Sequence, residues 1–193
     1  MDTSLAKRLA HSPVIATLYG AEQLGAFLKS AAGIAIVANI ELRRLQPVLA
    51  ALAEADKYAI VNIDSCDGLS QDRGGVDYLA DVGAKGVVST RVATIQRARR
   101  SGLLSVQKVF VTDRSTLPRS LTAIQQSEPS LVQLMPAPML PHIPANCRKG
   151  MPPVVASGFV CNRAGVIRAM GHGAVAVSTS DQQLWKLTER DLR

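Results

Sequence analysis

The chain has 193 residues, the size of one domain and enough to bury a hydrophobic core without disulfides or structural metal. Hydrophobic residues make up 47% and charged residues 19%, which excludes a disordered, collagen-like or low-complexity protein. The charge is unusual, because 22 Lys and Arg residues against 15 Asp and Glu residues give +7, which suggests a polyanionic partner. Aromatic residues are only 4%, so an RRM-like or OB-like module built on stacked bases is poorly supported.

The cysteines and the longest apolar run indicate where in the cell the protein is expected. Cys66, Cys147 and Cys161 are far apart and none lies in a CxxC pattern, so we expect free thiols and no metal site. The longest wholly apolar run, residues 31–38, is far shorter than the roughly 20 residues that cross a bilayer. The sequence therefore predicts a cytoplasmic protein that does not contact a membrane.

Short apolar runs rich in β-branched residues recur along the chain. They begin near residues 14, 34, 59, 84, 104, 130, 153 and 174, and apolar residues at helical spacing lie between most of them, as at Leu42, Leu45 and Leu49. Runs such as residues 59–63 are apolar on both faces, which is typical of strands in a parallel sheet. Eight successive strand–helix units predict an α/β fold, a compact (β/α)8 TIM-like barrel that forms one domain over residues 1–193.

This barrel must be small, because typical barrels of this kind have about 250 residues. We expect short loops, little regular helix in the proline-containing segment 139–150, and a short last helix over 181–187. An open, flavodoxin-like sheet is the alternative architecture.

In a parallel barrel the ligand site lies at the carboxyl ends of the strands, and the residues there are polar and small. Phosphate is commonly bound after the seventh and eighth strands, where Gly158 and the triplet Ser178, Thr179 and Ser180 stand. Ser180 is also a candidate N-cap of the last helix. The ligand-binding candidates are Asp64, Gly68, Ser89, Thr90, Arg91, Gln107, Lys108, Ser157, Gly158, Ser178, Thr179 and Ser180.

Two of these candidates carry more specific chemistry. Asp64 follows the third strand and would accept hydrogen bonds from ligand hydroxyls or act as a base, unless it is an ordinary turn residue. Gln107 and Lys108 alternate on one strand, so only one faces the barrel interior. Lys108 would pair with a phosphate or, in an enzyme, form a Schiff base. No arrangement for nucleophilic catalysis is present, so we expect no catalytic residues.

Basic residues cluster once, at the end of the fourth helical segment. Arg97, Arg99 and Arg100 lie close together on a helix, either as a solvated face or as contacts to RNA phosphates.

Several stretches resemble the glycerol-3-phosphate-responsive antiterminators, which regulate bacterial glycerol-uptake operons. They are PVIA (13–16), VNIDSCDGLSQD (61–72), GAKGVVSTR (83–91), ARRSGLLSVQKVFVTD (98–113) and GAVAVSTSDQQLW (173–185). The resemblance implies a TIM-like barrel that binds glycerol 3-phosphate as its effector, uses no cofactor, catalyses no reaction and, when liganded, binds leader mRNA so that transcription passes a terminator.

The family pattern falls on many of the same positions. It matches Asp64, Gly68, Ser89, Thr90, Gln107, Gly158, Ser178 and Thr179. The chain departs from it at Asn62, where the family has His, at Arg91 and Lys108, where the basic residue differs, and at Ala137 and Ser157, where the family has Gly. The last two border the expected phosphate position, so a related phosphate is an alternative ligand.

Two other functions remain open at this point. One is a small phosphosugar enzyme of the aldolase or isomerase type that uses Asp64 and Lys108. The other is a ligand sensor that acts on a protein partner instead of RNA. With any of these functions, the chain could form a homo-oligomer.

Overall fold

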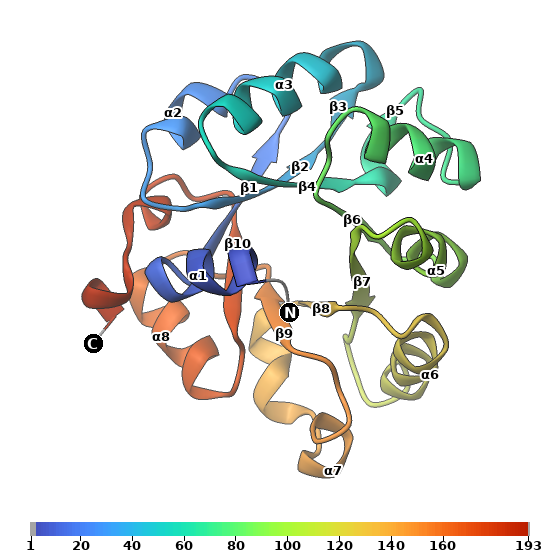
Figure 1. Cartoon of the computed structure of the whole chain (residues 1–193). Helices are drawn as coiled ribbons and strands as arrows, with labels where there is room; N and C mark the ends of the chain where they lie inside the picture. The colour runs from blue at the N-terminus through green and yellow to red at the C-terminus, as the bar shows by residue number, and fades with distance from the viewer. Residues whose placement is uncertain (1–2, 193) are drawn as a thin grey trace.

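The computed structural model describes residues 3–192 and is built around a closed barrel of eight parallel strands (Figure 1). Neighbouring strands follow the order β1-β10-β9-β8-β7-β6-β4-β2, and the pair β1 and β10 closes the sheet. The strands are β1 (Val14–Tyr19), β2 (Ile34–Ala38), β4 (Tyr58–Asn62), β6 (Gly86–Ser89), β7 (Leu104–Phe110), β8 (Leu131–Met135), β9 (Val154–Ser157) and β10 (Ala176–Thr179). The predicted (β/α)8 barrel is confirmed, and the open-sheet alternative is wrong.

Helices surround the barrel on the outside, as in Figure 1. They are α2 (Leu24–Leu28), α3 (Leu42–Glu54), α4 (Arg73–Asp81), α5 (Val92–Arg100), α6 (Leu117–Ser127), α7 (Ala145–Arg148) and α8 (Arg163–Gly171). Short 3-10 turns complete the connections: η1 (Ile63–Ser65), η2 (Ala137–His142), η3 (Leu184–Lys186) and η4 (Glu189–Leu192). A two-residue strand pair, β3 (Ile40–Glu41) and β5 (Cys66–Asp67), lies beside the barrel. None of the helices described is long and apolar enough to span a membrane.

The first helix, α1 (Thr3–His11), covers the amino-terminal end of the barrel, a role that the strand pattern did not reveal. Leu5 and Leu9 of α1 are buried in one cluster with inward-facing strand residues such as Ile15, Ile60 and Val106. This end of the barrel is therefore filled with apolar side chains and closed.

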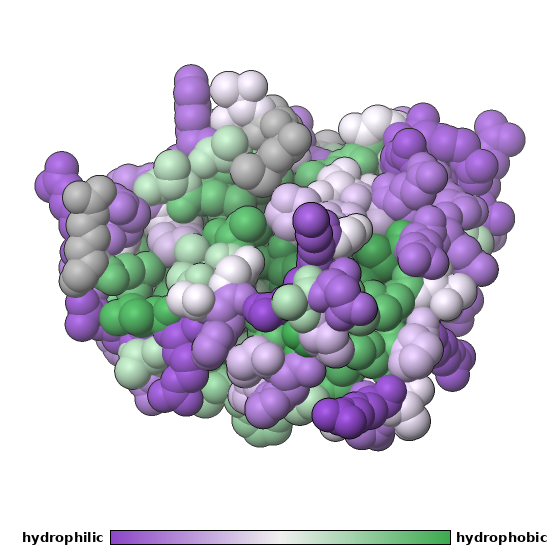
Figure 2. Space-filling view, turned by 90° about the horizontal axis from the view of Figure 1, so that it is seen from below, coloured by the Kyte–Doolittle hydropathy of each residue, from purple (hydrophilic) through white to green (hydrophobic). Residues whose placement is uncertain are grey.

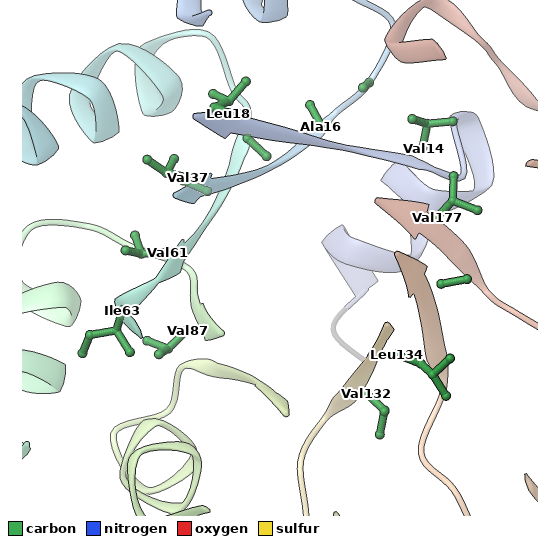
Figure 3. Packing of buried hydrophobic residues seen from close by; sticks show 14 of the residues in the cluster. Val14, Ala16, Leu18, Val37, Val61, Ile63, Val87, Val132, Leu134 and Val177 are labelled. Atoms are coloured by element: carbon green, nitrogen blue, oxygen red, sulfur yellow. The ribbon is translucent and has the colours of Figure 1, made fainter. Parts of the chain in front are cut away.

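A second and larger core lies between the strands and the surrounding helices. Figure 3 shows strand residues of this cluster, among them Val61, Val132 and Val177. Because side chains alternate along a strand, each barrel strand supplies one set of residues to the interior and another to the helix layer. Both faces of the sheet are thus covered, as the apolar runs predicted.

Two helices begin at side-chain caps that the sequence encodes. Asp72 accepts a hydrogen bond from the Gly75 amide (3.1 Å) at the start of α4, and Asn162 accepts one from the Gly165 amide (2.8 Å) at the start of α8. The backbone hydrogen bonds from Gly74 and Gly75 and the Ser70 hydroxyl lower the pKa of Asp72, with the Gly75 amide the largest cause.

The connection from β8 to β9 holds little regular helix, as the prolines predicted. It consists of η2 and the four-residue α7, and buried Leu140 and Ile143 pack this segment against the core. Figure 2 shows the molecule from below Figure 1, on the side where α7 lies, and apolar surface is visible there between hydrophilic side chains.

The expected last helix over 181–187 is wrong in extent and in its cap. Only Leu184–Lys186 forms a 3-10 turn, and the Ser180 side chain caps nothing there. Instead the carboxylate of Asp181 accepts a hydrogen bond from the Gln183 amide (2.9 Å), because a short Asp side chain can bond to the backbone two residues later.

We expect Trp185→Ala to lower the free energy of unfolding by about 3–5 kcal/mol. Trp185 is fully buried, packs edge-on against Phe27 (ring centroids 6.1 Å apart) and donates its indole N–H to the Thr179 carbonyl (2.8 Å). Trp185→Phe keeps an aromatic ring but loses the five-membered ring of the indole and its hydrogen bond, so we expect the free energy of unfolding to fall by about 1–3 kcal/mol. Urea unfolding followed by circular dichroism measures both, and an alanine variant within 1 kcal/mol of the wild type would contradict this assignment.

Candidate functional site

A cavity of about 690 Å³ opens at the carboxyl ends of the strands. Every barrel strand contributes to its wall, either by its last residues or by the residue that follows, and the connections after β9 and β10 complete it. The volume falls within the range of about 300–1,000 Å³ that is usual for small-molecule sites. The expected location of the ligand site therefore coincides with a cavity of suitable size.

Much of the cavity wall is polar because the inward-facing positions change from apolar to polar along most strands, although β2 contributes Ile36 and Ala38. Asn62 lies two residues after buried Ile60, and Lys108 lies two residues after buried Val106, so each pair shares the inner face of its strand. The same step leads from Leu131 to Gln133, from Val155 to Ser157 and from Ala176 to Ser178. The barrel interior thus has an apolar half at α1 and a polar half at the mouth.

Asp64 is held at the mouth by two residues at the end of β6 and directly after it. Its two carboxylate oxygens accept hydrogen bonds from the Ser89 hydroxyl (2.6 Å), the Thr90 amide (2.7 Å) and the Thr90 hydroxyl (2.8 Å). A carboxylate has about four acceptor positions, so roughly one stays available to a ligand hydroxyl. Ser89 does not line the cavity itself and acts by fixing Asp64.

Lys108 faces the cavity, whereas Gln107 points to the other side of β7. Gln107 is fully buried and donates to the carbonyls of Ser89 and Thr90 (3.3 and 2.9 Å), so it joins β7 to the end of β6. Burial lowers the pKa of Lys108, and the carboxylate of Asp64 partly opposes this shift. Within residues 3–192 the Lys108 ammonium makes no hydrogen bond or ion pair, which leaves a cation available to a bound anion.

Gln133, Ser157 and Ser178 form a hydrogen-bonded group on three adjacent strands. The Gln133 amide nitrogen donates to both serine hydroxyl oxygens (3.1 Å each), and the two hydroxyls bond to each other. The serine pair shares one hydroxyl proton, so the other hydroxyl proton stays available to an anion. Gln133 and Asn62 are buried, with 4% and 7% of their surface exposed. Their side-chain carbonyl oxygens have no hydrogen-bond partner among the described residues.

The loops after β9 and β10 provide backbone donors beside this group. Gly158 has a φ of +79°, which a residue with a side chain adopts only with strain, and this turn brings the chain along the cavity edge. The amides of Gly158, Phe159 and Ser180 form no hydrogen bond to another residue in the described part of the chain. The Thr179 hydroxyl is engaged, since it donates to the Val160 carbonyl (3.0 Å).

The structure brings eight of the expected ligand-binding residues together and leaves four outside the cavity wall. Those in the wall are Asp64, Thr90, Lys108, Ser157, Gly158, Ser178, Thr179 and Ser180. Those outside are Gly68, Ser89, Arg91 and Gln107. Gly68 serves a turn after β5 with a φ of +85°, and exposed Arg91 directly precedes α5.

The three arginines at the end of α5 lie in different surroundings. Arg97 and Arg100 border a shallow depression together with Arg73 and Asp77. Arg99 is paired with Glu128 across to the end of α6. Only the first two keep their charge unpaired within residues 3–192.

Sequence reasoning missed Gln133 and the aromatic residues at the cavity mouth. Gln133 is the one amide inside the apolar run 131–135, and a Gln in a buried strand needs hydrogen-bond partners, which was the available signal. Tyr19, Phe110 and Phe159 also line the cavity, yet nothing in the sequence separates them from core aromatics.

The described residues contain no cluster of His, Cys, Asp and Glu that could hold a metal ion, and the three cysteines are free thiols. Burial, together with the nearby carboxylate of Asp67, raises the pKa of the Cys66 thiol.

Residues 14–185 match the model of the family described as "Glycerol-3-phosphate responsive antiterminator". The chain is 25% identical over 183 residues to the uncharacterized protein YgcP of Escherichia coli K12, covering 94% of this chain and 96% of YgcP.

Solved structures share the fold. One is a glycerol uptake operon antiterminator-related protein from Thermotoga maritima, with a TM-score of 0.81 and 21% identity over 92% of this chain and 99% of that one. Another is a glycerol uptake operon antiterminator regulatory protein from Listeria monocytogenes, with a TM-score of 0.79 and 23% identity over 88% and 94% of the two chains. Three aldolases have the same barrel at lower similarity, with TM-scores of 0.64 to 0.66.

We expect Gly158→Ala to destabilise the protein by about 1–2 kcal/mol, because a Cβ at a φ of +79° is strained and would lie 3.4 Å from the Met135 side chain. Gly150→Ala is the matched control, since its Cβ meets no atom within 4 Å, and its stability should equal or slightly exceed that of the wild type. Thermal unfolding of both variants is the measurement. Equal melting temperatures for the two would show that the left-handed turn at Gly158 is not required.

Proposed function

The chain belongs to the glycerol-3-phosphate responsive antiterminator family, and from this we propose that it binds glycerol 3-phosphate and, when loaded, binds leader mRNA of a glycerol-utilisation operon. The bound leader would then let transcription pass a terminator. The observation that carries the proposal is the cavity mouth, where an unpaired, partly buried Lys108 faces a group of hydroxyl and amide donors.

The phosphate group of the effector suits the side of the cavity formed by β7, β9 and β10. Lys108 supplies the positive charge, and one serine hydroxyl of the Ser157–Ser178 pair keeps a proton to donate. The amides of Gly158 and Ser180 add backbone donors of the kind that bind phosphate in other barrels. These groups support an anion site that needs no metal or further cofactor.

The glycerol hydroxyls suit the acceptors on the rest of the wall. Asp64 retains about one acceptor position, and the carbonyl oxygens of Asn62 and Gln133 are buried without a partner among residues 3–192. An unsatisfied buried acceptor costs about 1–3 kcal/mol, which a ligand hydroxyl would recover. The cavity thus offers donors for a phosphate and acceptors for a polyol.

The proposed role requires binding and no reaction. None of His11, His142 and His172 lines the cavity, and the family is one of regulators. Lys108 is the single amine in the wall, so the aldolase-type alternative rests on that residue alone.

RNA binding is supported by the net charge of +7 and by unpaired arginines on the surface. Arg97 and Arg100 are candidates for contacts to RNA phosphates, and Arg99 would have to leave Glu128 to join them.

The experiment that tests this function measures binding of the leader transcript of the encoding organism's glycerol operon, with and without saturating glycerol 3-phosphate. We expect tight binding only with the effector, and an affinity that falls steeply with salt because counterions are released. Arg97→Ala and Arg100→Ala should each reduce the slope of log K against log salt by about 1. Arg43→Ala is the control, because Arg43 is already paired with Glu41. Absence of effector binding at millimolar concentration would refute the named effector.

Effector affinity should fall as the pH rises. The fall should begin at a lower pH than it would with a lysine of ordinary pKa. The cation of Lys108 attracts the phosphate, and burial lowers its pKa, so the attraction is present below that pKa and is lost as the pH passes through it. Calorimetry from about pH 7 upwards keeps the phosphate a dianion, because its second pKa is about 6.

Two variants of Lys108 separate this cause from others. Lys108→Arg keeps its charge throughout, so its profile should be flat. Lys108→Met should bind roughly 12- to 140-fold more weakly at neutral pH, the value of a hydrogen bond to a charged group. A wild-type profile as flat as that of Lys108→Arg would remove Lys108 from the phosphate site.

A further inference from the structure

Three exposed aromatic side chains stand around the mouth of the cavity. Tyr19, Phe110 and Phe159 are 49%, 52% and 82% exposed, and all three line the cavity. Among the described residues only one other large apolar side chain is exposed, Ile167 on α8. In a chain with so few aromatic residues, the exposed ones are concentrated at a single place.

The positions of these residues follow the order of the strands. Tyr19 ends β1, Phe159 follows β9 and Phe110 ends β7, so β10 separates Tyr19 from Phe159 and β8 separates Phe159 from Phe110. Two strand spacings correspond to roughly 10 Å. We name these three residues the aromatic rim.

The cavity is larger than the proposed effector requires. Its volume of about 690 Å³ lies well inside the range of sites for drug-sized molecules, and a three-carbon phosphate fills only part of it. With the effector against the polar wall, space remains at the mouth between the side chains of the rim.

The charges beside the rim favour an anionic partner. Arg91 follows cavity residue Thr90, and Arg114 lies in the connection that follows Phe110; both are exposed and neither forms an ion pair within residues 3–192. The nearby carboxylates of Asp64, Asp113 and Asp181 already accept hydrogen bonds from the protein. A second copy of a chain with net charge +7 would bring like charges together, whereas RNA brings phosphates.

We propose that the aromatic rim stacks unpaired bases of the bound RNA over the mouth of the effector cavity. Aromatic side chains bind single-stranded bases by stacking, and two or three of them on one surface are sufficient in other RNA-binding domains. This inference rests on the proposed function and adds the contact surface to it. Because the effector raises the affinity for RNA in the proposed function, bound RNA raises the affinity for the effector by the same factor.

The test compares rim variants in binding of the leader transcript at saturating glycerol 3-phosphate, so that a weaker effector site does not limit the result. Phe159→Leu keeps an apolar side chain and removes the aromatic face, and we expect binding about 5- to 140-fold weaker, the range of one base–aromatic stack. Phe159→Tyr keeps the face and should bind like the wild type. Ile167→Ala, an exposed apolar residue away from the rim, is the matched control and should also bind like the wild type.

The outcomes separate the rim from the function itself. If Phe159→Leu binds RNA as tightly as the wild type, the rim proposal is overturned and the antiterminator function stands. If the wild type binds no leader RNA with the effector present, that measurement alone refutes the proposed function, and the rim proposal fails with it. Light scattering tests whether a second copy of the chain occupies the rim instead. A wild-type dimer that dissociates in Phe159→Leu would assign the rim to that second copy and overturn the stacking proposal.

Discussion

The site depends on the parallel pairing of β1 with β10, which closes the sheet into a barrel. Val14, Ile15 and Ala16 are in register with Val177, Ser178 and Thr179, and this pairing leaves the barrel without an edge. In a closed sheet the alternation of side chains is fixed, because a strand that shifts its register by one residue turns its whole inner face outward. Each residue of the cavity wall is therefore placed by the pairing of its strand.

That constraint separates stability from function within a single set of inward-facing positions. The first inward positions are apolar and pack against Leu5 and Leu9 of α1, whereas on most strands the next positions toward the mouth are polar. Gln133, Ser157 and Ser178 satisfy most of one another's hydrogen-bonding groups, so the polar half costs little to bury even when it is empty. The few atoms left over, such as the carbonyl oxygen of Gln133, mark where a ligand gains most.

The sequence was sufficient for the architecture because the signal repeats. Eight apolar runs each carried the same information, and the strands begin within about two residues of the expected positions. The site was less predictable, since it depends on which alternate residues of each strand face the barrel interior. Whether Lys108 or Gln107 faces inward is decided by the pairing of β7 with β6 and β8, which the run itself does not contain. The cap expected from Ser180 failed for a local reason, because the adjacent Asp181 bonds to the backbone there.

Composition was the weakest guide to the mouth of the barrel. An aromatic content of 4% argued against base stacking, but an average over the chain says nothing about position. Phe27 and Trp185 are buried in the core, whereas Tyr19, Phe110 and Phe159 lie where the strands end. A few exposed rings at one opening matter more for recognition than a larger number in the interior.

The closed barrel also limits how an effector can act on a second ligand. A barrel packed on both faces has low compressibility, so a small molecule at its mouth has little means to move distant helices. An effector shifts an equilibrium only through contacts that differ between the two states, and here those contacts are confined to the strand ends and their loops. The surface that responds to the effector must then border the cavity. The aromatic rim does so, whereas Arg97 and Arg100 lie at the far end of α5, where they suit contacts that do not depend on the effector.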